Sequence, residues 1–462
     1  MRVVVIGGGI AGLAAAFDLA ARRPDAEVLL LEASPAVGGK LRLEKVAGIE
    51  VDVGAEAMLA RRPEAVGLAH AVGLGADLIH PLTTAAQVRA GGANHPLPAR
   101  TMFGLPADVD AVRSSGVLTD AALDRIAAEP SAAPMRPLTE DVSVGAVVRE
   151  RLGNEVVDRL VEPLLGGVFA GRADELSLQA TMPALAARLS RDGGSLVLAT
   201  QALADTGAHN PAAGPVFASL AGGVGALARA LAESGRFTVR TSATVRQVRR
   251  TPEGFELLCG PVPEPELVAA DAVIVATPAA KAAMLLRDTV PVAAAELAGI
   301  GTASVAIVTL AYGDVSLPAG SGLLVGTREG FGVKGVTLSS QKWPLQTGGL
   351  TMLRASVGRA GEAQLLQRDD ADLVALVRHE LQALIGVAAD PVDAQVTRWG
   401  GGLPQYGVGH VQRVARVRAA VGAVAGLAVC GASYDGVGIP ACIASAAMAV
   451  DQVVAALPAE GQ

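Results

Sequence analysis

The hydrophobic and polar positions of the first 32 residues follow three successive patterns. Residues 2–6, "RVVVI", are almost entirely apolar, as is typical of a strand buried on both faces. Residues 10–21 carry apolar side chains at helical spacing, and residues 27–32, "EVLLLE", form a second apolar run. This order predicts a strand, a helix and a second strand, with both strands parallel in one sheet.

Two later regions predict further strands. In residues 237–278, "FTVRTSATVRQVRR", the turn "TPEG" and "FELLCG" predict a hairpin, and "DAVIVATP" predicts a short buried strand. Near the end, "GLAVCGA" predicts a strand, "SYDGVGIP" a loop and residues 441–457 a helix, with Pro440 in its first turn. Because long insertions separate these regions, we predict one discontinuous α/β domain with other domains inserted into it.

Composition and charge limit the class of protein. A chain of 462 residues is too long for one ordinary hydrophobic core and predicts two or three domains. The net charge of −7, without a basic run longer than a pair, argues against a nucleic-acid partner. No run of about eighteen apolar residues is free of charges or proline, so no transmembrane segment is predicted. No signal peptide is predicted either, and a cytoplasmic location is expected.

The cysteines and histidines predict no metal site. Cys259, Cys430 and Cys442 have no CxxC spacing and are expected to be small buried hydrophobic residues. The six histidines include no HExxH motif and no paired spacing.

A glycine motif joins the first strand to the first helix. Gly7, Gly9 and Gly12 form GxGxxG, in which the first glycine permits a tight turn and the second admits a pyrophosphate. The third permits close packing of the helix on the strand, and the helix N-terminus attracts phosphate. Glu32 follows the second strand, placed to accept hydrogen bonds from a ribose hydroxyl. These features together predict a dinucleotide site, whereas a purely structural glycine turn would not require the acid.

Two further segments indicate which dinucleotide is bound. After Glu32 come Gly38, Gly39 and Lys40, a second backbone cradle that resembles the extended signature of FAD-dependent amine oxidases. "GASYDGVGIPACIASAAMAV" resembles the C-terminal flavin segment of the same enzymes. The resemblance implies that Val437, Gly438 and Ile439 lie near the isoalloxazine, where a helix N-terminus stabilises the reduced, anionic flavin. Non-covalent FAD is the expected cofactor, and an ordinary closing strand and helix is the alternative for this tail.

A narrower resemblance rests on three segments: "VEPLLGGVFAGRADELSLQATMP", "TRWGGGLPQYGVGH" and "YDGVGIPACI". They resemble the protoporphyrinogen and coproporphyrinogen oxidases of haem biosynthesis, and the resemblance covers essentially the whole chain. It implies an α/β fold with a Rossmann-like FAD domain of the p-hydroxybenzoate hydroxylase and amine oxidase type. The FAD domain is expected at residues 1–60, 222–280 and 420–462. A substrate-binding domain is expected at 61–90, 201–221 and 281–419, and a mostly helical domain at 91–200.

The resemblance also implies roles for individual residues. Gly167 lines the tetrapyrrole cavity, and Arg62 pairs with a substrate propionate, unless it is a solvated surface arginine. His410 is expected to be a structural hydrogen-bonding residue. The residues expected at the cofactor are Gly7, Gly8, Gly9, Ile10, Ala11, Gly12, Glu32, Ala33, Lys40, Gly54, Ala55, Glu56, Ala57, Val245, Trp399, Val437, Gly438 and Ile439.

The implied reaction removes six hydrogens from a reduced tetrapyrrole in three two-electron steps through the flavin. Dioxygen would reoxidise the flavin and yield hydrogen peroxide. Such chemistry depends on positioning, so no catalytic side chain is named. A ferrochelatase is a possible transient partner.

The acidic charge, the absent anchor and the compact "LARRPEA" segment resemble the soluble bacterial branch, which acts on coproporphyrinogen III. Protoporphyrinogen IX oxidation is the main alternative. An amine oxidase or a carotenoid desaturase would leave "EPLLGGVFAG" unexplained, and aromatic residues at 3% supply few groups for an amine cage. A non-catalytic porphyrin carrier would not require a flavin site at both ends of the chain.

Overall fold

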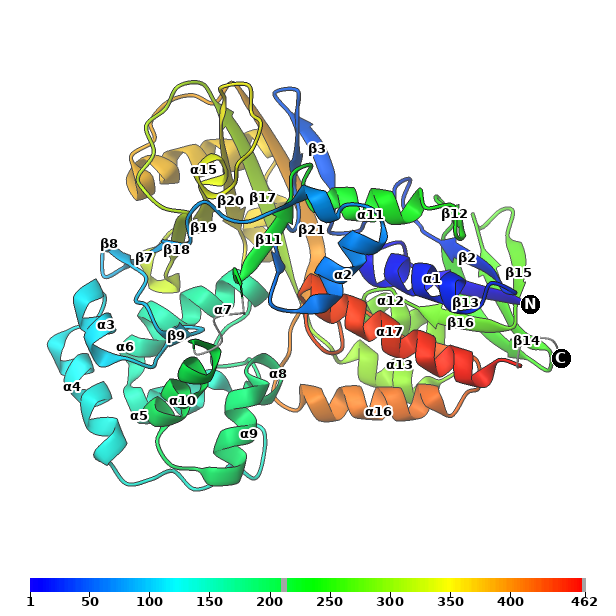
Figure 1. Ribbon diagram of the computed structural model, residues 1–462, viewed down its shortest axis with the longest axis horizontal. Helices are drawn as coiled ribbons and strands as arrows, with labels where there is room; N and C mark the ends of the chain where they lie inside the picture. The colour runs from blue at the N-terminus through cyan, green and yellow to red at the C-terminus, as the bar shows by residue number, and fades with distance from the viewer. Residues whose placement is uncertain (209–213, 459–462) are drawn as a thin grey trace.

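Five parallel strands form the sheet at the right of Figure 1, in the order β12–β2–β1–β16–β22. The computed structural model describes residues 1–208 and 214–458. The strands are β12 (Thr238–Arg240), β2 (Glu27–Leu31), β1 (Arg2–Ile6), β16 (Ala272–Val275) and β22 (Leu427–Val429). Val3 pairs with Val28 on one side and Ala272 on the other. The strands come from three distant regions of the chain. The apolar residues of β2, β1, β16 and β22 are buried, as expected for a parallel sheet covered on both faces, whereas β12 at one edge is partly exposed.

Helices cover one face of this sheet. They are α1 (Ile10–Arg22), α2 (Pro63–Ala71), α11 (Gly225–Ala232) and α17 (Ile439–Ala456), and their buried side chains share one hydrophobic core with the strands. The helix predicted at 441–457 is α17, which begins at Ile439, two residues before the predicted start, with Pro440 in its first turn as expected.

The other face carries a three-stranded antiparallel sheet and three helices. These elements are β13 (Val245–Thr251), β14 (Gly254–Cys259), β15 (Glu266–Ala270), α12 (Ala279–Leu286), α13 (Pro291–Ala298) and α16 (His410–Gly422). The predicted hairpin is confirmed for β13 and β14, but its first residues are not part of it. They form β12, which pairs with β2 in the parallel sheet because Ser242, at φ 53°, separates β12 from β13.

A mixed seven-stranded sheet lies at the upper left of Figure 1, covered by α15 (Asp370–Ile385). In sheet order its strands are β21 (Asp393–Pro404), β17 (Thr302–Tyr312), β20 (Thr351–Val357), β19 (Val333–Thr337), β18 (Gly322–Val325), β7 (Gln87–Ala90) and β8 (Ala93–Pro96). The two longest strands, β17 and β21, pair antiparallel and extend from this sheet toward the parallel sheet (Figure 1).

Helices fill the lower left of Figure 1 around a separate core. They are α3 (Val109–Ser115), α4 (Asp120–Ala128), α5 (Val144–Leu152), α6 (Asn154–Val156), α7 (Glu162–Phe169), α8 (Leu178–Thr181), α9 (Pro183–Asp192) and α10 (Leu196–Ala208). A π-helical turn, Val157–Val161, leads directly into α7. Such turns are frequent at functional sites.

Short elements connect these parts. They are β3 (Leu43–Val46), β4 (Ile49–Asp52), β5 (Met58–Leu59), η1 (Gly75–Asp77), β6 (Leu78–Ile79), β9 (Thr101–Met102), β10 (Leu105–Pro106), η2 (Glu129–Ser131), β11 (Phe217–Leu220), η5 (Thr327–Glu329), α14 (Ser339–Lys342) and η6 (Ala363–Gln367).

The predicted α/β class is confirmed, and the domain boundaries stay a prediction. Helices α12, α13 and α16 lie within the interval 281–419 or at its edges, yet they pack on the parallel sheet. Residues 209–213 of the predicted segment 201–221, and 459–462 of the segment 420–462, lie outside the described residues.

Among the described residues, α17 is the one helix long and apolar enough, by length and composition alone, to cross a membrane. Its 18 residues have a mean hydropathy of 1.6, and half of them are buried. The helix includes Pro440 and Asp451, and its buried residues pack on α1 and the parallel sheet. This packing is that of a core helix.

Candidate functional site

The glycine loop between β1 and α1 has the geometry that its motif predicts. Gly7 has φ +109°, a conformation that favours glycine. A Cβ on Gly12 would lie 1.9 Å from the carbonyl oxygen of Gly7, so this position packs the helix against the loop. A Cβ on Gly9 would meet no atom within 4 Å. Of these three glycines, only Gly9 therefore has open space beside its backbone, as a ligand phosphate requires.

The N-terminus of α1 suits an anion. Gly9 is its N-cap, no side chain caps it, and its first turn holds no acid. The first N–H groups of a helix have no partner within the helix and favour negative charge. The N-terminus of α11 differs, because the Asp52 carboxylate accepts hydrogen bonds from Val224 N–H (2.9 Å) and Gly225 N–H (3.0 Å). A dinucleotide phosphate therefore fits α1.

The second glycine segment lies directly against the first. Gly38 N–H donates to the Gly8 carbonyl (2.7 Å), and a Cβ on Gly39 would lie 3.2 Å from Gly9 Cα. Lys40 follows, and burial lowers the pKa of its ammonium. No carboxylate in residues 1–208 or 214–458 lies within ion-pair distance of Lys40. This segment therefore adds an uncompensated positive charge beside the first loop.

Glu32 occupies the position expected for a ribose ligand. Its carboxylate accepts hydrogen bonds from Gly8 N–H (2.6 Å) and from the Ser34 N–H and hydroxyl (2.7 Å each). These contacts orient the carboxylate. Both Ser34 groups donate to Oε1, so Oε2, which accepts from Gly8 alone, keeps a further lone pair for a hydroxyl donor. Ala33 follows it at the surface. The Glu32 carbonyl accepts from Ala243 N–H (2.8 Å), which brings Val245, two residues later, toward the same end of the site.

The C-terminal loop joins this site from the other end of the chain. Position Gly431 lies beside Ala11, since a Cβ there would be 3.8 Å from Ala11 Cβ. Gly438 is the N-cap of α17, which has no side-chain cap and no acid in its first turn. Val437 packs against the hydrophobic core of the helical part. The segment 437–439 therefore places a second open helix N-terminus at the site.

The loop of residues 54–57 lies between Lys40 and Trp399. A Cβ on Gly54 would lie 2.0 Å from the Lys40 carbonyl oxygen and 3.1 Å from Cζ2 of Trp399. Ala55 N–H donates to the Lys40 carbonyl (3.0 Å), and Trp399 Nε1 donates to the Val53 carbonyl (3.1 Å). The structure thus brings Trp399 of β21 against the expected cofactor segments.

Glu56 has partners that sequence reasoning did not identify. Its buried carboxylate pairs with the Lys342 ammonium and the Arg354 guanidinium, at 2.6 Å each. Burial opposes ionisation, but these two cations together hold the pKa of Glu56 at about 2. Arg354 also donates to the Gly54 carbonyl. The Glu56 side chain therefore fastens the loop to the seven-stranded sheet, so any cofactor contact of Glu56 is left to its backbone.

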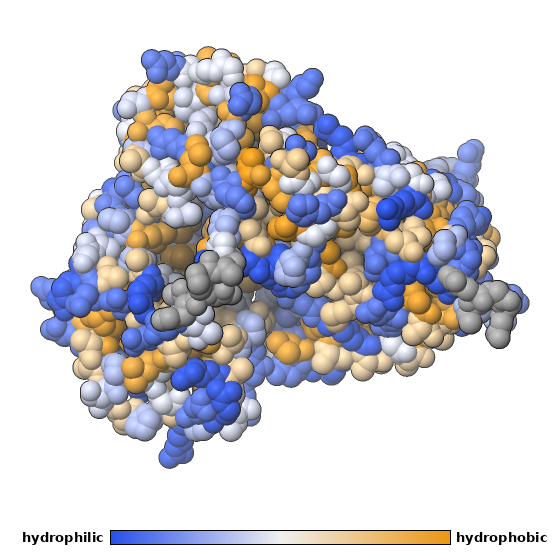
Figure 2. Space-filling model, in the orientation of Figure 1, coloured by the Kyte–Doolittle hydropathy of each residue, from blue (hydrophilic) through white to orange (hydrophobic). Residues whose placement is uncertain are grey.

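Helix α7 lies where the helical part, the seven-stranded sheet and the parallel-sheet part meet (Figure 1). Figure 2 shows a hollow in this region with hydrophobic residues at its edge. Gly167 is exposed on α7, and a Cβ there would lie 3.3 Å from Leu324 Cδ2. Arg62 is the N-cap residue of α2, where its guanidinium pairs with Glu64. A ligand carboxylate would compete with Glu64 for Arg62.

The distinctive sequence motifs meet in one aromatic cluster. Phe169 of α7 packs against Tyr406 at a centroid distance of 5.7 Å, and Tyr406 stacks on His410 at 4.1 Å. The Tyr406 hydroxyl donates to the Ala432 carbonyl in the C-terminal loop. His410 Nε2 is hydrogen-bonded to the Tyr434 carbonyl (3.1 Å), and burial lowers the pKa of its imidazole. His410 thus has the structural role expected of it, and the cluster connects the α7 wall to the C-terminal loop.

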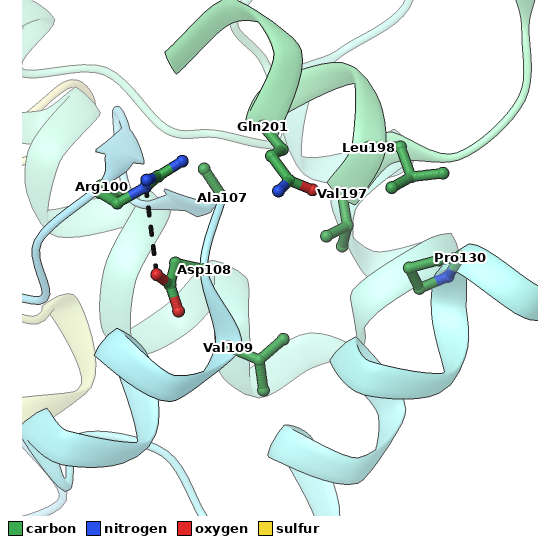
Figure 3. Close-up of a pocket in the computed structure, with 8 residues that line it drawn as sticks. All are labelled: Arg100, Ala107, Asp108, Val109, Pro130, Val197, Leu198 and Gln201. Atoms are coloured by element: carbon green, nitrogen blue, oxygen red, sulfur yellow. Dashed lines mark ion pairs between the residues drawn. The ribbon is translucent and has the colours of Figure 1, made fainter. Parts of the chain in front are cut away.

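A separate cavity of about 330 Å³ lies within the helical part (Figure 3). An ion pair of Arg100 and Asp108, at 4.0 Å, lies at one side of it. Its lining residues are Arg100, Ala107, Asp108, Val109, Pro130, Val197, Leu198 and Gln201, none of which belongs to the segments above. The part of the chain that the structure describes holds no group of three His, Cys, Asp or Glu residues suited to a metal ion.

Comparison with known proteins agrees with this geometry. A family model for flavin-containing amine oxidoreductases matches residues 10–454. A coproporphyrinogen III oxidase of Mycobacterium tuberculosis (strain ATCC 25618 / H37Rv) is 39% identical, over 99% of this chain and 98% of its own. One of Bacillus subtilis (strain 168) is 32% identical over 98% of both chains. A protoporphyrinogen oxidase of Macaca fascicularis is 30% identical over 99% of both.

Among solved structures, a candidate protoporphyrinogen oxidase from Exiguobacterium sp. 255-15 superposes with a TM-score of 0.86. It is 33% identical and covers 98% of both chains. The flavin-oxidoreductase type of the predicted fold is therefore confirmed.

Alanine substitutions separate the two glycine roles. We expect Gly9→Ala to fold normally but to lower flavin affinity at least about tenfold, equal to about 1.4 kcal/mol, because its methyl group occupies the phosphate space. Gly12→Ala should destabilise the protein by about 3 kcal/mol, because its methyl group meets the loop backbone. Flavin absorbance per protein and the thermal unfolding midpoint measure these effects. Gly67→Ala, in open space on α2, is the matched control. Equal flavin content in Gly9→Ala and this control would contradict the assignment.

Removing the Glu56 charge should weaken the junction between the loop and the seven-stranded sheet. Glu56→Gln leaves two buried cations without their partner, and we expect a loss of about 3 kcal/mol at neutral pH. Because the pKa of Glu56 is about 2 in the folded protein, this stabilisation is complete above the usual value of 4.5. It is lost as pH falls from there toward 2. The difference in unfolding midpoint between wild type and Glu56→Gln should shrink over that interval, whereas exposed Glu253→Gln should show no difference at either pH.

Proposed function

Since the chain belongs to the flavin-containing amine oxidoreductase family, we propose that it oxidises coproporphyrinogen III to coproporphyrin III with bound FAD. The observation that carries this proposal is the convergence of open α1 and α17 N-termini on one side with the glycine-rich α7 wall on the other. Bacterial relatives named coproporphyrinogen III oxidase support the substrate, because they match over nearly the full chain.

Bound FAD supplies two-electron chemistry, and six hydrogens leave the substrate in three such steps. Dioxygen accepts the electrons and is reduced to hydrogen peroxide. The chain's own residues act by positioning. Glu32 holds the ribose, the α1 N-terminus and Lys40 offset the pyrophosphate charge, and α17 directs its N-terminal field at the flavin ring.

The α7 wall positions the substrate. A flat macrocycle needs an apolar surface with little relief, and Gly166 and Gly167 provide backbone without side chains. The Phe169–Tyr406–His410 cluster holds this wall in a fixed relation to the C-terminal flavin loop. No side chain is assigned as a catalytic acid or base in this proposal, because positioning beside the flavin accounts for the chemistry.

We propose that the FAD is bound without a covalent link. The thiol at the C-terminal loop is Cys442, whose Sγ contacts the Gly436 and Val437 carbonyls at 3.8 and 3.9 Å. Burial raises the pKa of this thiol to about 11, so it stays protonated and is a poor nucleophile at neutral pH. A cytoplasmic location and transient transfer of the porphyrin to a ferrochelatase complete the proposal.

The proposal is tested by offering purified enzyme coproporphyrinogen III and protoporphyrinogen IX in parallel, in air. We expect a flavin absorbance spectrum, release of the flavin by acid precipitation, and porphyrin fluorescence that develops with a higher kcat/KM for coproporphyrinogen III. Hydrogen peroxide should accumulate with the porphyrin. A preference for protoporphyrinogen IX would assign the chain to the alternative substrate, and a flavin-loaded protein that oxidises neither would overturn the proposal.

Arg62 tests the expected propionate contact. We expect Arg62→Ala to raise KM for coproporphyrinogen III about tenfold with little change in kcat, because a charge-assisted hydrogen bond contributes about 1.5 kcal/mol. The control is Arg287→Ala, whose side chain is 74% exposed on another part of the molecule. An unchanged KM would show that Arg62 serves only its surface pair with Glu64.

A further inference from the structure

Lys334 is a buried cation in an unusual backbone position. Val333 of β19 pairs with Val357, and Gly335 pairs with Ser356, so Lys334 is the extra residue of a β-bulge. The bulge places Val333 and Lys334, consecutive in the strand, both in the interior at 0% and 5% exposure. Bulges redirect side chains in this way and are frequent beside active sites.

The ammonium of Lys334 lies beneath the proposed substrate wall. Its Nζ donates to the Gly166 carbonyl in the last turn of α7, at 3.0 Å. Leu324 Cδ2 would lie 3.3 Å from a Cβ on Gly167 and 3.5 Å from a Cβ on Gly335, so α7, β18 and β19 meet here. Gly166, Gly167 and Gly335 all lie at this junction and contribute no side chain to it.

The described part of the chain places no carboxylate in an ion pair with this ammonium. No carboxylate in residues 1–208 or 214–458 lies within 4 Å of Lys334 Nζ. The Glu380 carboxylate of α15 lies close in space to this part of β19, but it accepts the Gly332 and Val333 N–H groups, at 2.9 and 2.7 Å. An ammonium can donate three hydrogen bonds, and one acceptor is present.

A second buried cation increases the positive charge. Arg359 is 6% exposed, and its guanidinium reaches the Phe331 and Val325 carbonyls only at 3.4 Å each. Its carboxylate partner, Glu362 at 3.5 Å, also pairs with Arg172 at 3.1 Å. Burial and the Arg359 charge together lower the pKa of Lys334 to about 8. Lys334 therefore has no ionic partner among the described residues, and Arg359 shares its carboxylate partner with Arg172.

Lysine is rare in this chain, and its few positions differ in burial. Only five of the 38 basic residues are lysines. Lys45 and Lys281 are exposed, whereas Lys40, Lys334 and Lys342 are buried or half-buried. A buried cation without a partner is costly, and the α7 C-terminus offsets only part of that cost.

We propose that Lys334, supported by Arg359, binds a carboxylate of the tetrapyrrole at a position separate from Arg62. The inference rests on the proposed function, since a substrate with four propionates needs more than one cation. The ligand carboxylate would accept the remaining hydrogen bonds of Lys334 and supply its missing counter-charge.

The test compares Lys334→Met with Lys281→Met, an exposed lysine on α12, in the flavin-loaded enzyme. We expect the Kd for coproporphyrin III, followed by porphyrin fluorescence, and the KM for coproporphyrinogen III to rise about tenfold or more in Lys334→Met only. Its kcat should stay within about threefold of the wild-type value. The uncharged tetramethyl ester of coproporphyrin III should bind wild type and variant equally.

A second variant separates charge from helix capping. Lys334→Gln keeps a donor for the Gly166 carbonyl but has no charge, so it should lose coproporphyrin III affinity as Lys334→Met does. Wild-type affinity in Lys334→Gln, or an equal loss for the acid and its ester, would overturn the inference and leave Lys334 as a helix cap. A wild-type enzyme that neither binds coproporphyrin III nor oxidises coproporphyrinogen III would instead overturn the proposed function.

Discussion

Close backbone approach at the carboxyl edge of the parallel sheet is the constraint on which this structure depends. The loop at Gly7–Gly12 and the segment at Gly38–Lys40 touch through main-chain atoms, with Gly39 against Gly9. Two helix N-termini, those of α1 and α17, must stay uncapped by side chains at the same place. Any larger residue would either fill the phosphate space or separate the segments. The glycines at these positions leave the backbone N–H groups uncovered and allow the segments to touch.

This arrangement requires rigid support, because the loops themselves contribute few side-chain contacts. The support is ionic on one side and aromatic on the other. Glu56 ties its loop to Lys342 and Arg354. Because Arg354 is buried and the other two side chains are largely shielded from solvent, removal of one charge would leave the remaining charges poorly compensated. Tyr406 connects the C-terminal loop to α7 through a tilted ring contact with Phe169 and a hydrogen bond to the Ala432 carbonyl. These contacts therefore fix the glycine loops, the C-terminal loop and α7 relative to one another.

Sequence patterns were sufficient for the elements whose causes are local. The apolar runs of β1, β2, β16 and β22 predicted buried strands, because each strand is apolar throughout or after a single charged first residue. Local causes also account for the predicted turn at GxGxxG, the acid that follows the second strand, and the start of the last helix at Pro440. The hairpin prediction failed at β12, where the apolar pattern does not distinguish a hairpin strand from the edge of a parallel sheet. The roles of Gly167 and Arg62 came from family resemblance and stay predictions.

By itself, the sequence determined the order of strands and helices, the dinucleotide motif and the family, because these depend on residues within a few positions of one another. The tertiary structure alone decided which charges meet. Glu56 and its partners are 286 and 298 residues apart, and Lys334 reaches a carbonyl 168 residues away through a bulge. Periodicity carries no information about such pairs, because strand register and domain packing decide which buried side chains come within hydrogen-bond distance.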